Sequence, residues 1–330
     1  MKRCFFTLFI LVALAGCTKA DSVAVDTYTP TPLRFNADGT FKIALICDVH
    51  LHLPNVLKSE QAENLITTTL RQEKPDLAFF LGDAVWSPAT LTGFTELAML
   101  CVNERIPYSF VLGNHDRDGG LYGETIFHLL SQLPYFVGRD GLASLSGNGN
   151  YDLPILNAVS NKVEAVLYGL DSHDTGPYIL DDYYDCIKTD QIDWYRQVSR
   201  NYTEANQGTP LPSLMFFHIP LIEYNDAYAQ GLLTGQKNEN VHGPKVNSGM
   251  FDAVVAQKDV MGIFVGHDHD NNFLATLNNV ILGYGNLTGY GSYGSMQRGV
   301  RMVTLQQGVH AFQTYIRLDD GNIIDRWPNN

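Results

Sequence analysis

The sequence predicts an α/β protein built on a sheet that is buried on both faces. Two observations lead to this class: short uninterrupted apolar runs recur from residue 41 onward, and longer amphipathic stretches lie between them. Apolar runs without polar alternation are typical of strands covered on both sides. Strands that alternate with helices build an α/β core. The runs lie at 43–47, 77–81, 110–112, 166–170, 214–217 and 263–265.

The stretches between these runs predict helices. Ser59 can cap the first one, which carries apolar residues at 62, 65, 66 and 70 on one face and ends before Pro75. Further helices are expected at about 93–103, at 121–132, after Asp190 and at about 248–257.

The pattern changes after residue 270. Apolar stretches at 273–277 and 280–284 flank Asn278-Asn279, a dipeptide suited to a two-residue hairpin turn. More strands are expected at 300–305 and 311–318, and Asp320-Gly321 supplies another turn. We therefore predict antiparallel strands that extend the same domain.

The first segment has the features of an export signal. Lys2 and Arg3 precede an apolar run at 5–14 that is too short to cross a bilayer. The sequence Leu14-Ala15-Gly16-Cys17 then resembles a bacterial lipobox, in which Cys17 becomes the lipidated first residue; cleavage near Ala15 by an ordinary signal is the alternative. An acylated Cys17 predicts an exported protein, anchored by lipid at a bacterial cell-envelope membrane.

These features predict the organisation of the chain. We expect a lipoprotein signal peptide at 1–16, the lipidated cysteine with a polar tether at 17–35, and one folded domain at 36–330. Of the five cysteines, Cys47, Cys101 and Cys186 fall in that domain and form no CxxC pair. They allow at most one disulfide, and buried free thiols are the expected state.

Composition narrows the range of partners. The formal net charge is −13 and 45% of the residues are hydrophobic, which fits an ordinary globular protein. An acidic surface repels nucleic acid backbones, so general nucleic-acid binding is not expected. A phosphorylated substrate stays possible because bound cations dominate the field at a metal site. Nothing in the sequence determines the oligomeric state.

Five predicted strands end in residue types that bind metal ions. The motifs that follow them are Asp48-Val49-His50, Gly82-Asp83, Gly113-Asn114-His115-Asp116, His218 and Gly266-His267-Asp268-His269. Sites in α/β sheets form in the crevice beyond the carboxyl ends of strands, where ligands are held rigidly. Most of these motifs are weak evidence alone, since Gly-Asp is a common turn and a single histidine is usually structural. Their ordered combination is what predicts a site.

The chemistry of these side chains favours two metal ions. The candidate ligands are the carboxylates, imidazoles and amide of Asp48, His50, Asp83, Asn114, His218, His267 and His269. Such a nitrogen and oxygen set suits Mn²⁺, Zn²⁺ or iron. Seven groups exceed the needs of one tetrahedral ion, and a carboxylate can bridge two. Two divalent ions roughly 3.5–4 Å apart can activate one shared hydroxide.

This ordered set resembles the calcineurin-like metallophosphoesterase superfamily over about residues 41–305. It is most similar to the purple-acid-phosphatase-like branch, which the stretches 217–221, 246–249 and 283–299 also resemble. The resemblance implies a four-layer α/β/β/α sandwich with mixed sheets, forming a single catalytic domain. True purple enzymes carry a tyrosine where this chain has Trp86, and the first motif supplies His50 instead. A purple tyrosinate–iron centre is therefore not expected.

The resemblance also implies a role for each residue. It assigns Asp48, His50 and His269 to one ion, assigns Asn114, His218 and His267 to the other, and makes Asp83 the bridge. His115 would face the substrate and stabilise or protonate the departing oxygen. Asp116 would orient the imidazole of His115.

The predicted activity is hydrolysis of a phosphate ester by a metal-bridging hydroxide, with a phosphomonoester of a small molecule as the substrate. A phosphodiesterase or nucleotidase would use the same ligands. A non-catalytic surface lipoprotein that keeps the fold as a binding module is the alternative from another class. Trp86 and the glycine- and tyrosine-rich stretch 283–295 could line the substrate pocket or could only pack within the structure. Arg117 could reach a substrate phosphate, with a surface ion pair as the alternative.

Overall fold

The computed structural model describes residues 31–175 and 184–328. The predicted signal peptide, Cys17 and most of the predicted tether lie outside these residues. Across the two described segments, no helix combines the length and the apolar character that crossing a membrane requires.

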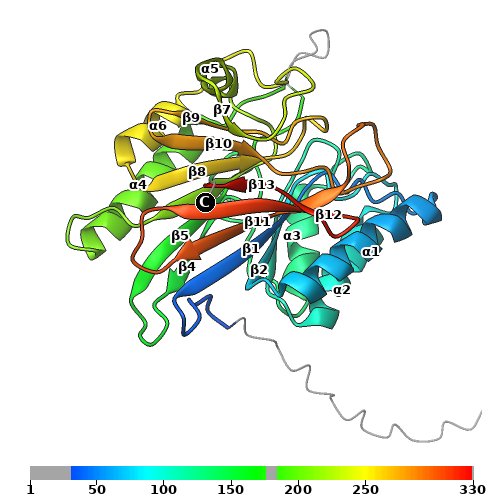
Figure 1. Ribbon diagram of the computed structural model, residues 1–330, viewed down its shortest axis with the longest axis horizontal. Coiled ribbons are helices and arrows are strands. Elements are labelled where there is room, and N and C mark those ends of the chain that lie inside the picture. Colours follow the sequence, from blue (N-terminus) through cyan, green and yellow to red (C-terminus); the bar gives the residue numbers. More distant parts are fainter. Residues whose placement is uncertain (1–30, 176–183, 329–330) are drawn as a thin grey trace, which may run out of the picture.

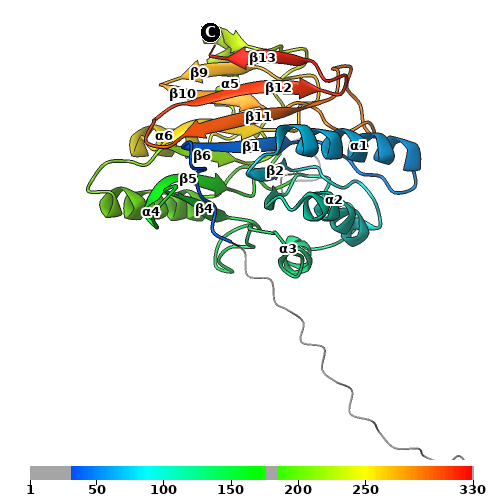
Figure 2. The same ribbon diagram turned by 60° about the horizontal axis from the view of Figure 1, so that its bottom comes forward.

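Two mixed sheets form the centre of the molecule, and helices cover their outer faces (Figures 1 and 2). The helices α1 (Val56–Glu73), α2 (Thr90–Glu104) and α3 (Gly123–Ser131) lie on the side of one sheet. The helices α4 (Thr189–Ala205), α5 (Glu223–Gln230) and α6 (Met250–Gln257) pack on the other. The result is the expected α/β/β/α sandwich in one domain.

The six-stranded sheet has the order β13-β12-β11-β1-β2-β3. Its strands are β1 (Thr40–Ile46), β2 (Leu77–Leu81), β3 (Tyr108–Val111), β11 (Gly299–Gln306), β12 (Phe312–Leu318) and β13 (Ile323–Trp327). The first three are parallel, and β11 to β13 add antiparallel strands beside β1. Parallel neighbours β1, β2 and β3 therefore end at the same edge of the sheet.

The seven-stranded sheet has the order β4-β5-β6-β8-β10-β9-β7. Its strands are β4 (Tyr151–Leu156), β5 (Val163–Gly169), β6 (Ser213–Phe216), β7 (Leu232–Thr234), β8 (Val260–Val265), β9 (Leu274–Leu277) and β10 (Val280–Tyr284). The strands β5, β6, β8 and β10 are parallel. Asn278 and Asn279 both adopt positive φ between β9 and β10, which confirms the predicted hairpin turn.

Aromatic side chains fill the space between the sheets. The rings of Phe79 in β2 and Phe216 in β6 lie 4.4 Å apart, and Phe264 in β8 contacts Phe312 in β12. A second core fills the outer face of the seven-stranded sheet beneath α4, α5 and α6. The three cysteines of the domain are free, as expected, and Cys47 and Cys101 are buried.

The structure corrects the predicted start of the first helix. Helix α1 begins at Val56, so Ser59 lies inside the first turn instead of capping it. The Ser59 hydroxyl donates to the carbonyl oxygen of His52 in the preceding loop, at 3.1 Å. The polar side chain therefore fixes the loop that follows β1, which is a tertiary role that the capping pattern does not reveal.

Candidate metal centre

The seven predicted ligands follow the ends of five strands, and five of the seven line one pocket. Asp48 and His50 follow β1, Asp83 follows β2 and Asn114 follows β3, all in the six-stranded sheet. His218 follows β6, and His267 and His269 follow β8 in the seven-stranded sheet. All seven side chains are buried. The structure brings six of them together in two groups of three, and Asn114 lines the pocket beside them.

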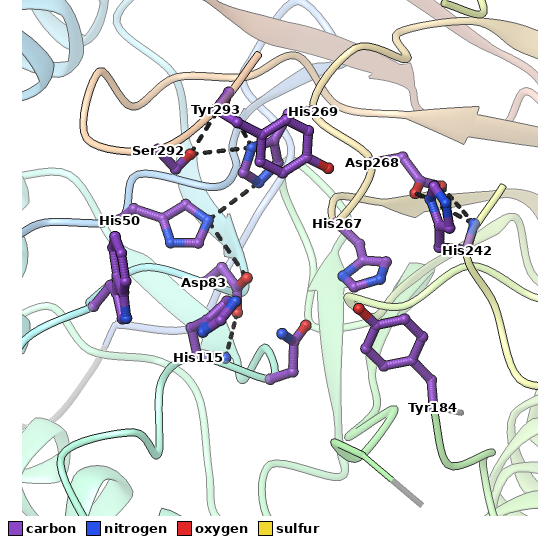
Figure 3. Close-up of a pocket in the computed structure, with 12 residues that line it drawn as sticks. His50, Asp83, His115, Tyr184, His242, His267, Asp268, His269, Ser292 and Tyr293 are labelled. Atoms are coloured by element: carbon purple, nitrogen blue, oxygen red, sulfur yellow. Dashed lines mark hydrogen bonds and ion pairs between the residues drawn. The ribbon is translucent and has the colours of Figure 1, made fainter. Parts of the chain in front are cut away.

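The first group of donors is Asp48, His50 and His269. The Nε2 atoms of His50 and His269 are 3.1 Å apart, and His269 Nε2 lies 3.5 Å from Asp48 Oδ1 (Figure 3). His269 Nδ1 donates to the carbonyl oxygen of Tyr293 at 3.0 Å, so its Nε2 keeps a lone pair directed at the group. Two ring nitrogens this close can share only a proton or a cation.

The second group is Asp83, His218 and His267. His218 Nδ1 donates to the carbonyl oxygen of Leu81 at 2.8 Å, which directs Nε2 into the site. That Nε2 atom and Asn114 Oδ1 are both buried, and neither has a hydrogen-bond partner. Buried polar atoms without partners are rare and costly. A bound cation would satisfy both atoms.

Asp83 lies between the two groups. Its Oδ2 atom is 3.5 Å from His50 Nε2 and 3.3 Å from His218 Nε2. Its other oxygen, Oδ1, accepts the backbone N–H of His115 at 2.8 Å. One carboxylate oxygen is therefore directed at imidazoles from both groups, which is the position that a bridging ligand needs.

The electrostatics of the site also suit cations. Burial raises the pKa of Asp83, but the adjacent His218 outweighs burial and holds that pKa well below its ordinary value. Burial lowers the pKa of His50 to about 4, and burial with the neighbouring His218 lowers that of His267 to about 3. The pocket thus offers an ionised carboxylate beside the neutral imidazoles of His50 and His267. Burial opposes the charge on the other two imidazoles, but Asp83 raises the pKa of His218 to about 10 and Asp48 raises that of His269 above its ordinary value.

A third group of metal-binding residue types does not share these properties. It consists of Glu239, His242 and Asp268. Asp268 accepts hydrogen bonds from His242 Nδ1 and from the Tyr284 hydroxyl, and Glu239 accepts from the Asp270 N–H and the Tyr293 hydroxyl. Since these carboxylate oxygens already have partners, this group has no unsatisfied donor set for an ion. The fit to metals is specific to the first two groups.

The backbone is strained where it presents the ligands. Asp48, His50, Asp83 and His267 have φ values of 52°, 44°, 46° and 77°. Residues other than glycine seldom adopt positive φ, and each such residue costs about 1–3 kcal/mol where it is held there. The sharp turn after each buried strand directs the side chain across the edge of the sheet. The concentration of this strain at the predicted ligands indicates a functional site.

His115 also lies in the pocket, but its partner is not the predicted one. The carboxylate of Asp116 is fully buried and accepts the backbone N–H groups of Val85 and Gly113 at 2.9 and 2.8 Å. The prediction that Asp116 orients the imidazole of His115 is therefore wrong. Asp118 accepts the hydrogen bond of His115 Nδ1 at 2.7 Å instead. Asp116 joins the loops after β2 and β3, and burial raises its pKa to about 7.

Comparison with known proteins gives the family. The model of the calcineurin-like phosphoesterase family matches residues 41–271, which contain every predicted ligand. The chain belongs to this family.

The relatives of this chain include proteins named as purple acid phosphatases, which confirms the predicted branch. Over 88% of the chain and 85% of the relative, it is 30% identical to the probable inactive purple acid phosphatase 29 of Arabidopsis thaliana. Identity to the probable inactive purple acid phosphatase 14 of the same plant is 31%, over 95% and 90% of the two chains.

Solved structures confirm the fold. A dimetal phosphatase from Danio rerio superposes with a TM-score of 0.59 at 12% identity, covering 87% of this chain and 96% of the other. A purple acid phosphatase from yellow lupin seeds gives 0.54 at 11% identity, covering 90% of this chain and 54% of the other. At these identities the likeness concerns the architecture alone.

Two glycines of the phosphoesterase motifs make room for the carboxylates. A Cβ atom on Gly113 would lie 2.2 Å from Asp83 Oδ1, and one on Gly266 would lie 2.5 Å from Asp48 Oδ2.

Gly113→Ala is therefore expected to displace Asp83. The displacement should lower the amount of bound metal and destabilise the fold by about 1–3 kcal/mol through overpacking. Metal analysis and urea unfolding of the variant measure both effects. Full metal content would show that Asp83 tolerates the shift.

The pairing of His115 with Asp118 leads to a second prediction. In Asp118→Asn the amide can present its NH₂ group to Nδ1, which favours the wrong tautomer of the ring. We expect a loss of about 10–100-fold in turnover with both metals retained. If His115 protonates the departing oxygen, the loss should be larger for alkyl phosphates than for p-nitrophenyl phosphate, whose leaving group needs no proton.

Asp193→Asn is the matched control, because Asp193 pairs with Arg196 on the exposed face of α4. An equal loss on both substrates would mean that Asp118 serves only the fold of its loop.

Several pocket residues lie outside the metal motifs. Trp86 is partly exposed and lines the pocket, with its ring 6.2 Å from that of His50 and 5.9 Å from that of His115. Ser292 and Tyr293 bring the glycine- and tyrosine-rich stretch to the wall, which settles two options that the sequence left open. Tyr184, His242 and Asp268 complete the lining and were not predicted to do so.

Arg117 has a structural role. It pairs with Asp171 at 2.5 Å, and the Asp171 side chain is fully buried. The same carboxylate accepts the backbone N–H of Asn148, so Asp171 at the end of β5 holds both the loop after β3 and the loop before β4. Arg117 is not among the residues that line the pocket, so it is not placed to reach a substrate phosphate there.

Proposed function

We propose that this chain is a phosphohydrolase with a dinuclear metal centre, and that it cleaves a phosphomonoester. The observation that carries the proposal is the place of Asp83, with one oxygen within 3.5 Å of imidazole nitrogens from two separate donor groups. A carboxylate in that position suits two cations better than one. Manganese, zinc and iron all accept this mixture of nitrogen and oxygen donors.

The chemistry divides between the ions and the protein. Bound divalent ions supply Lewis acidity, activate water as the nucleophile and neutralise the charge of the phosphate. Asp48 and Asp83 provide the negative charge that retains them. His115 is held by Asp118 through Nδ1, which leaves Nε2 free to serve the departing oxygen of the ester. No side chain is needed as a covalent nucleophile.

Metal analysis combined with a panel of phosphate esters tests this function. We expect two equivalents of divalent metal per chain and turnover of p-nitrophenyl phosphate that disappears on chelation and returns when metal is added. The value of kcat/KM for p-nitrophenyl phosphate should exceed that for bis-p-nitrophenyl phosphate. The reverse order would make the protein a phosphodiesterase.

A non-catalytic role is the competing proposal, because three of the relatives carry the word inactive in their names. Against it stand the seven buried donors and His115, all of which are present. Six of the donors form two groups, and Asn114 and His115 line the same pocket as members of both groups. A purified protein that contains no stoichiometric metal and hydrolyses neither ester would establish the binding module instead.

We also propose that the protein is exported and anchored by lipid at Cys17. The support is the order of Lys2, Arg3, the apolar run and the lipobox-like Leu14-Ala15-Gly16-Cys17. Cys17→Ser should abolish incorporation of labelled fatty acid and release the protein from the membrane fraction. Cys186→Ser is the matched control and should change neither property. Release of the unmodified protein would favour an ordinary signal peptide.

A further inference from the structure

His242 shares the pocket with the candidate metal centre but belongs to neither donor group. It lies in the loop between β7 and α6, and half of its side chain is exposed. Figure 3 shows it beside Asp268, on the far side of His267 from His115. With the departing oxygen at His115, an alcohol portion that crosses the pocket would reach His242.

The orientation of the His242 ring is determined by buried groups. Its Nδ1 atom donates to Asp268 Oδ1 at 2.7 Å, and its backbone N–H lies 3.2 Å from Asp268 Oδ2. The Tyr284 hydroxyl donates to the same Oδ2 atom at 2.6 Å, and both Asp268 and Tyr284 are buried. With Nδ1 committed as a donor, the neutral ring presents Nε2 as an acceptor. No residue in the described segments donates to that Nε2 atom.

The surroundings of His242 favour hydrogen-bond donors over phosphate. The carboxylates of Asp268 and Glu239 lie within 4.8 Å of the His242 imidazole. No lysine or arginine is among the described residues that line the pocket. A phosphate group is drawn to cations at the centre, whereas anions near His242 repel it. The acidic end suits the uncharged part of the ester.

We propose that His242 recognises a hydroxyl group on the alcohol portion of the substrate, which makes phosphomonoesters of polyols or sugars the substrate class. The inference rests on the proposed function for the position of the phosphate. A hydroxyl donates to Nε2, while Asp268 and Tyr284 hold the ring in place. An ester that lacks the hydroxyl leaves the acceptor without a partner, and such sites reject the analogue that cannot bond.

Glycerol 3-phosphate and n-propyl phosphate form a matched pair for the test, because both have three carbons and only one has free hydroxyls. We expect wild-type kcat/KM to favour glycerol 3-phosphate by about tenfold, which corresponds to one hydrogen bond. In His242→Ala the preference should fall to near unity through loss of activity on glycerol 3-phosphate alone. His310→Ala, which changes an exposed histidine away from the pocket, should keep the preference.

A binding measurement separates this inference from the proposed function. Calorimetry with 3,4-dihydroxybutyl phosphonate and butyl phosphonate, which are not hydrolysed, should show the same tenfold preference and the same loss in His242→Ala. If the wild type binds the dihydroxybutyl phosphonate more tightly but hydrolyses no ester, the proposed enzyme activity is refuted and the role of His242 stands. Equal binding of the two phosphonates by the wild type, or equal losses for both in the variant, would overturn that role.

Tyr284→Phe removes one hydrogen bond from Asp268 without touching the pocket wall. It should reduce the preference by a smaller factor than His242→Ala and leave the metal content unchanged. An unchanged preference would show that Tyr284 does not position the ring.

Discussion

Asp83→Asn is expected to lose metal from both halves of the centre together. The oxygen that faces His50 and His218 would become part of a neutral amide, which neutralises little of the charge of two adjacent cations. Removing a residue that only hydrogen-bonds to a metal ligand already lowers the affinity for the metal 10–100-fold. Replacing the shared ligand itself should cost on the order of a hundredfold or more, and turnover should fall with occupancy.

Metal titration followed by elemental analysis measures this result. Asp185→Asn is a suitable control, since Asp185 is a partly buried carboxylate that pairs with Lys188 outside the pocket. Selective loss of one ion, with the other retained at full occupancy, would contradict the assignment of Asp83 as the bridge.

His115→Ala is expected to separate catalysis from metal binding. The imidazole belongs to neither donor group, and the contact with Asp83 is made by the backbone N–H of His115, which the substitution retains. Both metals and the stability of the fold should therefore be unchanged. Turnover should fall by roughly 10²–10⁴-fold, the usual contribution of a positioned proton donor.

Steady-state kinetics and metal analysis of the same preparation provide the measurement. His128→Ala, an exposed histidine on α3, should match the wild type in both. A His115→Ala protein that lost its metals would show that the imidazole supports the centre itself, and its proposed role toward the substrate would have to be abandoned.

The ligands could be predicted because they follow strands whose burial is visible in the sequence. The segment 77–81 is apolar at every position and is buried at every position, and Asp83 comes just after it. The same logic fails at sheet edges. Strand β4 contains Pro154 and alternates buried with half-buried residues, and the three-residue β7 has one exposed and two half-buried residues. Neither has the continuous apolar signal of a central strand.

Residues held by tertiary contacts could not be predicted in this way. The pairing of His115 with Asp118 depends on a turn that brings together residues three apart in sequence. The motif pointed to the adjacent Asp116 instead. His242 lies in a loop far from any predicted strand end, and only the folded chain brings it to Asp268. Helix α5 was also not predicted, because its polar sequence EYNDAYAQ contains only a few scattered apolar residues.

The donors come from both sheets, with Asp48, Asp83 and Asn114 on one and His218, His267 and His269 on the other. Cations held between them would cross-link the two halves of the sandwich at one rim. A ligand that binds only the folded state adds about 2.7 kcal/mol at a hundred times its dissociation constant. Removing the metal would therefore make that rim more susceptible to proteases. The supply of ions would then govern the lifetime of the protein as well as its turnover.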